Sequence, residues 1–190
     1  MIVNGGVDPL DELLRGTDGT VSAGRPARIV ASLAAAGLTV ATAESLTGGL
    51  LTAALTSVPG SSDVVRGGLV VYATDLKQSL AGVDSRLLAD CGPVDPAVAV
   101  ALAEGARERC GADIGVALTG VAGPDPQDGK APGTWFVALA TPIGAATAGS
   151  AWPAAAGAAV DRRSVRADAV NAAFDLLDAA SREQSRAAGR

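Results

Sequence analysis

Short apolar segments rich in β-branched residues alternate with helical segments along the first part of the chain. Segments of this kind at 38–44, 67–75 and 112–120 are typical of buried strands. Strands that alternate with helices favour a sheet that is covered by helices on both faces. Two further strand patterns, at 134–141 and 145–152, follow each other without a helix and indicate an antiparallel pair. The sequence therefore predicts a three-layer α/β/α sandwich with a mixed, mostly parallel sheet.

Helical patterns occupy the stretches between and after these strands. The most clearly marked helix has residues typical of helix ends on both sides. Asp95 suits an N-cap, Pro96 the first turn and Gly111 the position after the last turn. These helices supply the outer layers of the predicted sandwich. The other predicted helices lie at 25–37, 50–58 and 161–183, with shorter helical turns at 75–82 and 84–92.

The chain of 190 residues is long enough for one domain with a sizeable core. We expect this single domain over residues 25–182. Residues 1–24 are rich in Gly and Asp without a sustained period, so we expect a flexible leader there, with a short helix at 9–14 as an alternative. Residues 183–190 are mainly polar and small, which predicts a frayed tail.

The charge of the chain argues against nucleic-acid binding. Its formal net charge is −5, aromatic residues are few, and the basic residues form no stripe. The uncharged segment 131–160 is long enough to span a bilayer. It consists mainly of small residues with three prolines, however, and such a segment inserts poorly. We therefore predict a buried hairpin with its loop there, and neither a nucleic acid nor a membrane as partner.

The two cysteines, Cys91 and Cys110, have no CxxC spacing, and the chain contains no histidine. Zinc sites need such ligands in clusters, so no metal and no cofactor is predicted. We interpret the cysteines as reduced thiols, although spacing alone leaves a disulfide open. With no signal peptide visible at the N-terminus, the expected location is the cytoplasm.

The segment TVATAESLTGGLL, residues 39–51, takes a predicted strand into a predicted helix through a serine and two glycines. Ser45 is a candidate nucleophile, and a simple helix N-cap is the alternative. The backbone N–H groups of Thr47, Gly48 and Gly49 are candidates for holding an anion at the helix start. A Ser-His-Asp triad within this chain is excluded because histidine is absent.

The rarity of lysine and tyrosine in this chain indicates which groups could activate that serine. Of the 15 basic residues, 13 are Arg, and Lys occurs only at Lys77 and Lys130. Lys77 follows the sole tyrosine, Tyr72, by five residues. Burial lowers the pKa of a lysine, so its amine can become neutral and accept a proton. An arginine stays protonated and cannot do so. Lys77 is therefore the candidate base, with Tyr72 as proton relay or support. A solvated surface lysine and a packing tyrosine are the alternatives.

Two other segments are candidates for substrate contacts. The third predicted strand ends in the glycine turn Thr119-Gly120-Val121-Ala122-Gly123-Pro124, which supplies further N–H donors. The last helix begins with Arg162, Arg163 and Arg166. These guanidinium groups suit a phosphate clamp, and a solvated basic face is the alternative.

Several of these motifs occur together in one known family. The sequence over about 25–178 resembles the C-terminal domain of the CinA (competence/damage-inducible protein A) family, in its stand-alone form. The resemblance implies an amidohydrolase that deamidates nicotinamide mononucleotide to nicotinic acid mononucleotide and ammonia during pyridine-nucleotide recycling. The motifs that carry it, in order, are TAESLTGG, VPGSSDVVRGGLVVYATDLKQ, LAGV, CGPVD, LTGVAGP and PGTWFVALA.

The resemblance also implies roles for individual residues. It points to Ser45 as nucleophile, assisted by Tyr72 and Lys77. It implies a pocket lined by the turn after the third strand and by the basic start of the last helix. The substrate-binding candidates are Glu44, Thr47, Gly48, Gly49, Thr119, Gly120, Gly123 and Arg162.

This sequence departs from the family pattern at four places. Leu46 stands where Cys is common, Ala73 where Ser is common, and Val160 where Gly is common. The loop residues 125–128 read Asp-Pro-Gln-Asp where the family has a Gly-Gly pair. Two alternatives therefore remain: a catalytically weakened nucleotide-binding or interaction module, and a hydrolase of another small amide. A homo-oligomer that pairs through 145–152 is also left open.

Overall fold

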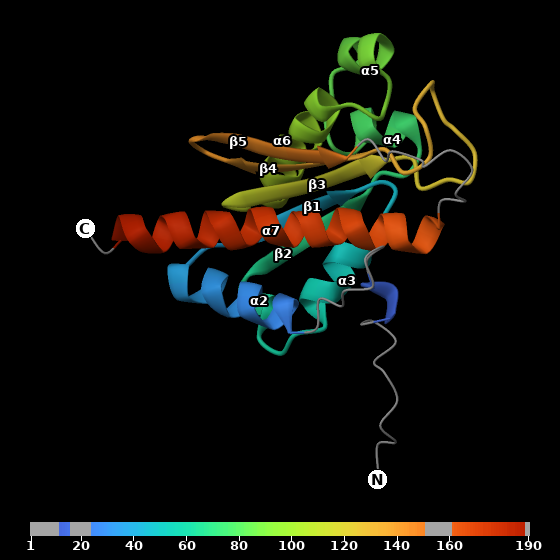
Figure 1. Ribbon diagram of the computed structural model, residues 1–190. Helices are drawn as coiled ribbons and strands as arrows, with labels where there is room; N and C mark the ends of the chain where they lie inside the picture. The colour runs from blue at the N-terminus through green and yellow to red at the C-terminus, as the bar shows by residue number, and fades with distance from the viewer. Residues whose placement is uncertain (1–11, 16–23, 151–160, 189–190) are drawn as a thin grey trace.

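The computed structural model describes residues 12–15, 24–150 and 161–188. A five-stranded sheet with the order β2-β1-β3-β4-β5 forms its centre (Figure 1). β1 pairs in parallel with β2 and β3, whereas β3–β4 and β4–β5 are antiparallel pairs. The sheet is mixed, as the sequence predicts. The strands are β1 (Val40–Glu44), β2 (Val65–Val70), β3 (Ile114–Gly120), β4 (Trp135–Thr141) and β5 (Gly144–Ser150).

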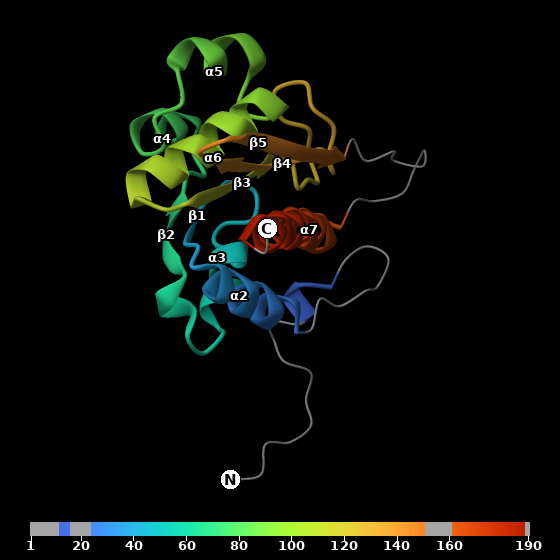
Figure 2. The ribbon, with the colours of Figure 1, turned by 90° about the vertical axis from the view of Figure 1, so that its left-hand side faces the viewer.

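Helices cover both faces of the sheet, which confirms the predicted three-layer α/β/α architecture. Figure 2 shows α2, α3 and α7 on one side and α4, α5 and α6 on the other. Each face has its own apolar cluster: one is centred on Leu51, Val116 and Phe174, and the other on Val98 and Leu102. The helices are α2 (Arg25–Ala36), α3 (Leu50–Thr56), α4 (Thr74–Ser79), α5 (Ser85–Cys91), α6 (Pro96–Cys110) and α7 (Arg162–Ala188).

Local signals in the sequence place several helix ends correctly. The Asp95 carboxylate accepts a hydrogen bond from Ala97 N at 2.8 Å at the start of α6. Gly111 and Gly37 end α6 and α2 in the left-handed conformation, with φ of 60° and 65°. Such caps are encoded within a few residues, so they can be predicted without knowledge of the tertiary structure.

The second strand differs from its expected span. The sequence predicts a strand over 67–75, whereas β2 ends at Val70 and α4 begins at Thr74. β2 lies at the edge of the sheet and pairs only with β1, which ends at Glu44. Beyond that point β2 has no strand to pair with, so the chain is free to turn. Tyr72 therefore lies in the link between β2 and α4.

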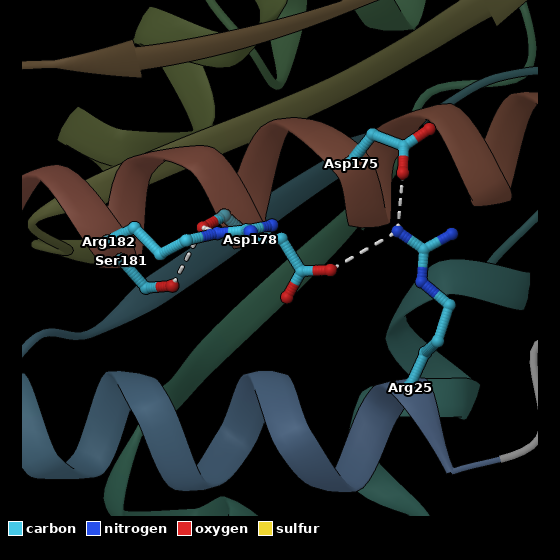
Figure 3. A network of polar contacts seen from close by, with 5 residues as sticks. All are labelled: Arg25, Asp175, Asp178, Ser181 and Arg182. Atoms are coloured by element: carbon cyan, nitrogen blue, oxygen red, sulfur yellow. Dashed lines mark hydrogen bonds and ion pairs between the residues drawn. The ribbon is translucent and has the colours of Figure 1, made fainter.

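Arg25 ties the first and last helices of the sandwich together (Figure 3). Its Nη2 donates to Asp175 Oδ1 at 2.6 Å and to Asp178 Oδ2 at 3.3 Å. The guanidinium carbon also lies 5.5 Å from the centre of the Phe174 ring. This network positions α2 beside α7, and because Asp175 is largely exposed we expect the ion pair itself to stabilise the fold only modestly.

The segments expected to be a leader and a tail both have described parts. Leu14 is buried in the core at 1% exposure, and Glu12 forms an ion pair with Arg163 at 3.2 Å. At the other end, α7 continues to Ala188, past the predicted end of the domain at Arg182 and into the predicted tail. The remainder of 1–24 outside 12–15 and Gly24 is not among the described residues.

The uncharged segment forms a hairpin as far as it is described, but the prediction that the hairpin is buried is wrong for its second strand: β4 is mostly buried, whereas residues 144–147 and 149 of β5 are exposed because β5 lies at the edge of the sheet. Its residues up to Ser150 form a loop, β4 and β5, while 151–160 fall outside the described residues. No helix within the described ranges is both long and apolar enough to cross a membrane. Cys91 and Cys110 are free thiols, each partly buried.

Candidate active site

The loops that follow the three parallel strands meet at one edge of the sheet. β1 ends at Glu44, β2 at Val70 and β3 at Gly120, and the carboxyl ends of parallel strands are the usual place for a ligand in such sheets. A cavity of about 120 Å³ opens at this edge. The residues that line it are Ser45, Leu46, Tyr72, Lys77, Pro93, Val94, Thr119, Gly120, Val121, Ala122, Gly123, Asp125, Gln127 and Arg162.

Ser45 and Lys77 are in direct contact within this cavity. The Lys77 Nζ lies 3.0 Å from the Ser45 Oγ, 2.8 Å from the carbonyl oxygen of Val71 and 3.4 Å from that of Tyr72. Two N–H bonds of the amine are thus directed to carbonyl oxygens, while the third position faces the serine. In the neutral amine, the lone pair can take this third position and accept the Ser45 proton.

The environment of Lys77 favours loss of its proton. The residue is 1% exposed, and within the described part of the chain no carboxylate forms an ion pair with it. Burial lowers the pKa of Lys77 from 10.5 to about 8, since desolvation disfavours the charged amine. Roughly a tenth of the molecules then carry a neutral Lys77 at pH 7. The alternative of a solvated surface lysine is wrong.

The turn that carries Ser45 is built by its backbone. Ser45 N donates to Leu118 O on the neighbouring strand at 2.9 Å, and Gly48 N donates to Ser45 O at 3.0 Å. Gly48 and Gly49 have φ of 61° and 96°, a conformation that favours glycine. The N-cap of α3 is Gly49, which provides no side-chain cap, so the alternative reading of Ser45 as an N-cap is wrong.

The Glu44 carboxylate does not line the cavity. It is fully buried and accepts hydrogen bonds from Gly49 N at 3.0 Å, Leu51 N at 3.1 Å and Thr52 N at 2.8 Å, and from Thr52 Oγ1 at 2.6 Å. This carboxylate therefore occupies the N-terminus of α3, where the sequence suggests a site for a bound anion. Within the described residues, the N–H groups of Leu46 and Thr47 have no acceptor, and of these two residues only Leu46 lines the cavity.

Tyr72 presents its backbone and its side chain to different partners. Its carbonyl oxygen faces Lys77, whereas its hydroxyl accepts a hydrogen bond from Arg162 Nη2 at 2.8 Å. Arg162 Nη1 donates to Gly123 O at 2.7 Å. Arg162 thus bridges the loops after β2 and β3. The predicted relay through the Tyr72 hydroxyl has no direct contact with Lys77 in this arrangement.

The three arginines at the start of α7 have separate roles. Arg162 alone among them lines the cavity. Arg163 pairs with Glu12, and Arg166 Nη2 donates to Thr47 O at 2.7 Å, which holds the serine turn against α7. The fold therefore reduces the set of candidate phosphate ligands to Arg162.

Of the other substrate-binding candidates, some line the cavity and some do not. Thr119, Gly120 and Gly123 line the cavity, although the Thr119 hydroxyl already donates to Pro93 O at 2.6 Å. Thr47, Gly48 and Gly49 lie outside the lining. Pro93 and Val94 also line it, although the sequence assigned them no role. Pro93 and Val94 follow a helix rather than a strand, so the rule about strand ends could not find them.

Comparison with known proteins gives the same assignment as the motifs. Residues 24–180 match the family model described as the CinA C-terminal domain. The chain belongs to this family. The CinA domain thus covers both helical layers and the whole sheet of the described fold.

Similar CinA proteins are known from several bacteria. A CinA-like protein of Frankia casuarinae is 49% identical over 139 residues, which cover 73% of this chain and 31% of that protein. A CinA-like protein of Synechocystis is 43% identical over 147 residues, covering 74% of this chain and 35% of its own length. The chain spans about a third of the length of these curated relatives.

Solved structures of the CinA superfamily share the fold. A competence/damage inducible protein from Agrobacterium tumefaciens is 32% identical, with a TM-score of 0.75 and coverage of 92% of this chain and 98% of that chain. A CinA superfamily protein from Escherichia coli is 28% identical, with a TM-score of 0.72 and coverage of 96% and 94%.

The departures from the CinA pattern differ in their distance from the site. Leu46 is buried and lines the cavity, so it adds apolar surface there. Ala73 takes the N-cap position of α4 and provides no side-chain hydrogen bond. Val160 lies outside the described residues. In the loop, Asp125 and Gln127 line the cavity, whereas Asp128 forms a turn with Gly129.

Proposed function

We propose that this chain is an amidohydrolase that deamidates nicotinamide mononucleotide to nicotinic acid mononucleotide and ammonia. The observation that carries the proposal is the 3.0 Å contact between Ser45 Oγ and the buried Nζ of Lys77. A serine nucleophile paired with a lysine of lowered pKa is suited to acyl transfer. Membership of the CinA family supports the same assignment.

In the proposed reaction, neutral Lys77 accepts the Ser45 proton as the Oγ attacks the carboxamide carbon. The negative charge that develops on the carboxamide oxygen is stabilised by the backbone N–H group of Leu46, which lines the cavity. Lys77 then donates its proton to the nitrogen, which leaves as ammonia when the C–N bond breaks. A water molecule attacks the acyl-enzyme, its proton passes to Lys77, and Ser45 regains a proton as the acid is released.

The lining of the cavity suits the two ends of this substrate. Leu46, Val94 and Val121 offer apolar surface to the nicotinamide ring near Ser45. Arg162, at the start of α7, offers a guanidinium group to the phosphate. Its contacts with Tyr72 and Gly123 hold the guanidinium in place before a substrate binds.

The test is ammonia release from nicotinamide mononucleotide by the full chain. We expect Ser45→Ala and Lys77→Met to lower kcat by at least about a hundredfold, because each removes a group that acts in the bond-breaking steps. Lys130→Met is the matched control and should retain activity, since Lys130 does not line the cavity. Equal activity of the Lys77 and Lys130 variants would exclude the proposed base.

A second candidate is hydrolysis of a smaller carboxamide. The cavity of about 120 Å³ is small beside typical ligand pockets of roughly 300–1,000 Å³, so it accommodates a ring more readily than a whole nucleotide. The same assay with nicotinamide separates the two candidates. Ammonia release from nicotinamide but not from the mononucleotide would favour the smaller substrate, and binding without release from either would favour a non-catalytic module.

A further inference from the structure

Among the described residues that line the cavity, Asp125 is the sole carboxylate. The charged side chains of this lining are Lys77, Asp125 and Arg162. When Lys77 is neutral, as the proposed reaction requires, the remaining charges are one negative and one positive. A cavity with this pair attracts a ligand that also carries both signs of charge.

The loop around Asp125 is held by backbone hydrogen bonds. Gln127 N donates to Lys130 O at 3.1 Å and Lys130 N donates to Gln127 O at 2.9 Å, with the Asp128-Gly129 turn between them. At the base of the loop, Val121 N donates to Thr134 O at 2.8 Å. These bonds hold the chain on both sides of Asp125, which itself lines the cavity.

The nearby cations leave Asp125 free to meet a ligand. Arg162 directs its two terminal nitrogens to Tyr72 and Gly123, not to Asp125. Within the described part of the chain, Asp125 takes part in no ion pair. Asp125 is exposed and lies in the lining of the cavity, so its carboxylate is suited to hold a cationic ring there.

We propose that Asp125 is a specificity-determining residue that selects a carboxamide carried on a cationic pyridinium ring. The inference rests on the proposed function for the identity of this ring, because the nicotinamide of the mononucleotide is positively charged through its N-glycosidic bond. Asp125 faces the ring charge and Arg162 the phosphate. The pair of charges in the cavity matches the pair of charges in the substrate.

The test uses two small ligands that differ in charge. The full chain carrying Ser45→Ala, which keeps the ligand intact, is titrated at pH 7 with 1-methylnicotinamide, a cation, and with nicotinamide, which is neutral. We expect Asp125→Asn in this background to raise the Kd for the cation by about three- to tenfold and to leave the Kd for nicotinamide unchanged.

A matched control lies on the same loop. Asp128→Asn removes the same charge three residues away, outside the cavity lining, and asparagine tolerates the φ of 50° found there. We expect the Asp128 variant to bind both ligands as the parent does. An equal loss of cation binding in both loop variants would mean a general field effect and would overturn the assignment to Asp125.

The oxidised and reduced mononucleotides give an independent readout, because reduction makes the ring neutral and leaves the ribose and phosphate in place. Asp125→Asn should weaken binding of the oxidised form alone. Equal weakening of both forms would assign the carboxylate to the ribose hydroxyls and refute the proposal. Absence of ammonia release by the unmodified chain would instead count against the proposed function, while the charge selectivity would still decide the role of Asp125.

Discussion

At the scale of single residues, Lys77 shows how burial changes the chemistry of a side chain. Its amine is held between two backbone carbonyls and the Ser45 hydroxyl, with 1% of the residue exposed. Neighbouring cations are not the cause of its lowered pKa, which follows from desolvation. The same lysine on an exposed helix would be almost fully protonated at neutral pH.

The pH dependence of the rate follows from this pKa. In the proposed reaction Lys77 acts in its neutral form, so kcat/KM should rise about tenfold per pH unit below the pKa and level off above about 8. The rate rises with pH because deprotonation produces the neutral amine, and the pKa of about 8 lies above neutral pH. Initial rates of ammonia release between pH 6 and 9.5 measure the profile.

The control for this profile is Lys130→Met, which should give the same curve as the unmodified chain. A profile that is flat from pH 6 to 9.5, with the chemical step rate-limiting, would show that no group of this pKa takes part as a base.

At the scale of elements, Glu44 joins the end of β1 to the start of α3. Its carboxylate accepts three backbone hydrogen bonds and one from a hydroxyl. A negative charge at a helix N-terminus is also favourable to the helix dipole. The sequence reading counts Glu44 among the substrate-binding residues, whereas the structure directs its side chain into the fold. Its effect on Ser45 is therefore one of position.

Glu44→Gln should destabilise the protein. The amide retains one acceptor oxygen and brings an NH2 group among N–H donors, so buried groups lose their partners at a cost of about 2–4 kcal/mol in the free energy of unfolding. Urea denaturation measures the change. The matched control, Glu104→Gln, alters an exposed glutamate of α6 and should change stability by less than about 0.5 kcal/mol. Similar midpoints for the two variants would contradict the capping role.

At the scale of the whole molecule, the close approach of α6 to the sheet sets the spacing of one layer. A Cβ built on Gly115 of β3 would lie 1.9 Å from the backbone oxygen of Ala103 on α6. The helix and the strand can therefore approach each other only because this position has no side chain. This layer supplies Val98 and Leu102 to its apolar cluster, and the link before α6 carries Pro93 and Val94 to the cavity.

Gly115→Ala should lower the free energy of unfolding by about 2 kcal/mol or more, because the added methyl group forces α6 away from the sheet. Thermal or urea denaturation measures the loss. Gly67→Ala, on edge strand β2, is the control: its added Cβ meets only the Cys110 sulfur at 3.6 Å, an ordinary contact. Equal stability of the two variants would show that the layer spacing adapts without cost.

Much of this fold can be predicted from short stretches of sequence. The helix that begins after Asp95 and ends at Gly111 carries its own boundary signals, and the alternation of strands and helices indicates the three layers. Scarcity of residue types also selects Tyr72 and Lys77, and the turn between a predicted strand and a predicted helix selects Ser45. The end of β2 could not be predicted, because it depends on where the neighbouring strand β1 stops.

The directions of the side chains at the site required the assembled structure. Ser45, Lys77 and Arg162 come from distant parts of the chain, and their distances depend on how strands, loops and α7 pack. The contacts that the Glu44 and Tyr72 side chains make also depend on neighbours from other elements. Local pattern by itself determined the elements and the candidate groups, since caps and periodicity act over a few residues. Only tertiary packing decided which groups meet and which lose their water, because contact and desolvation belong to the assembled chain.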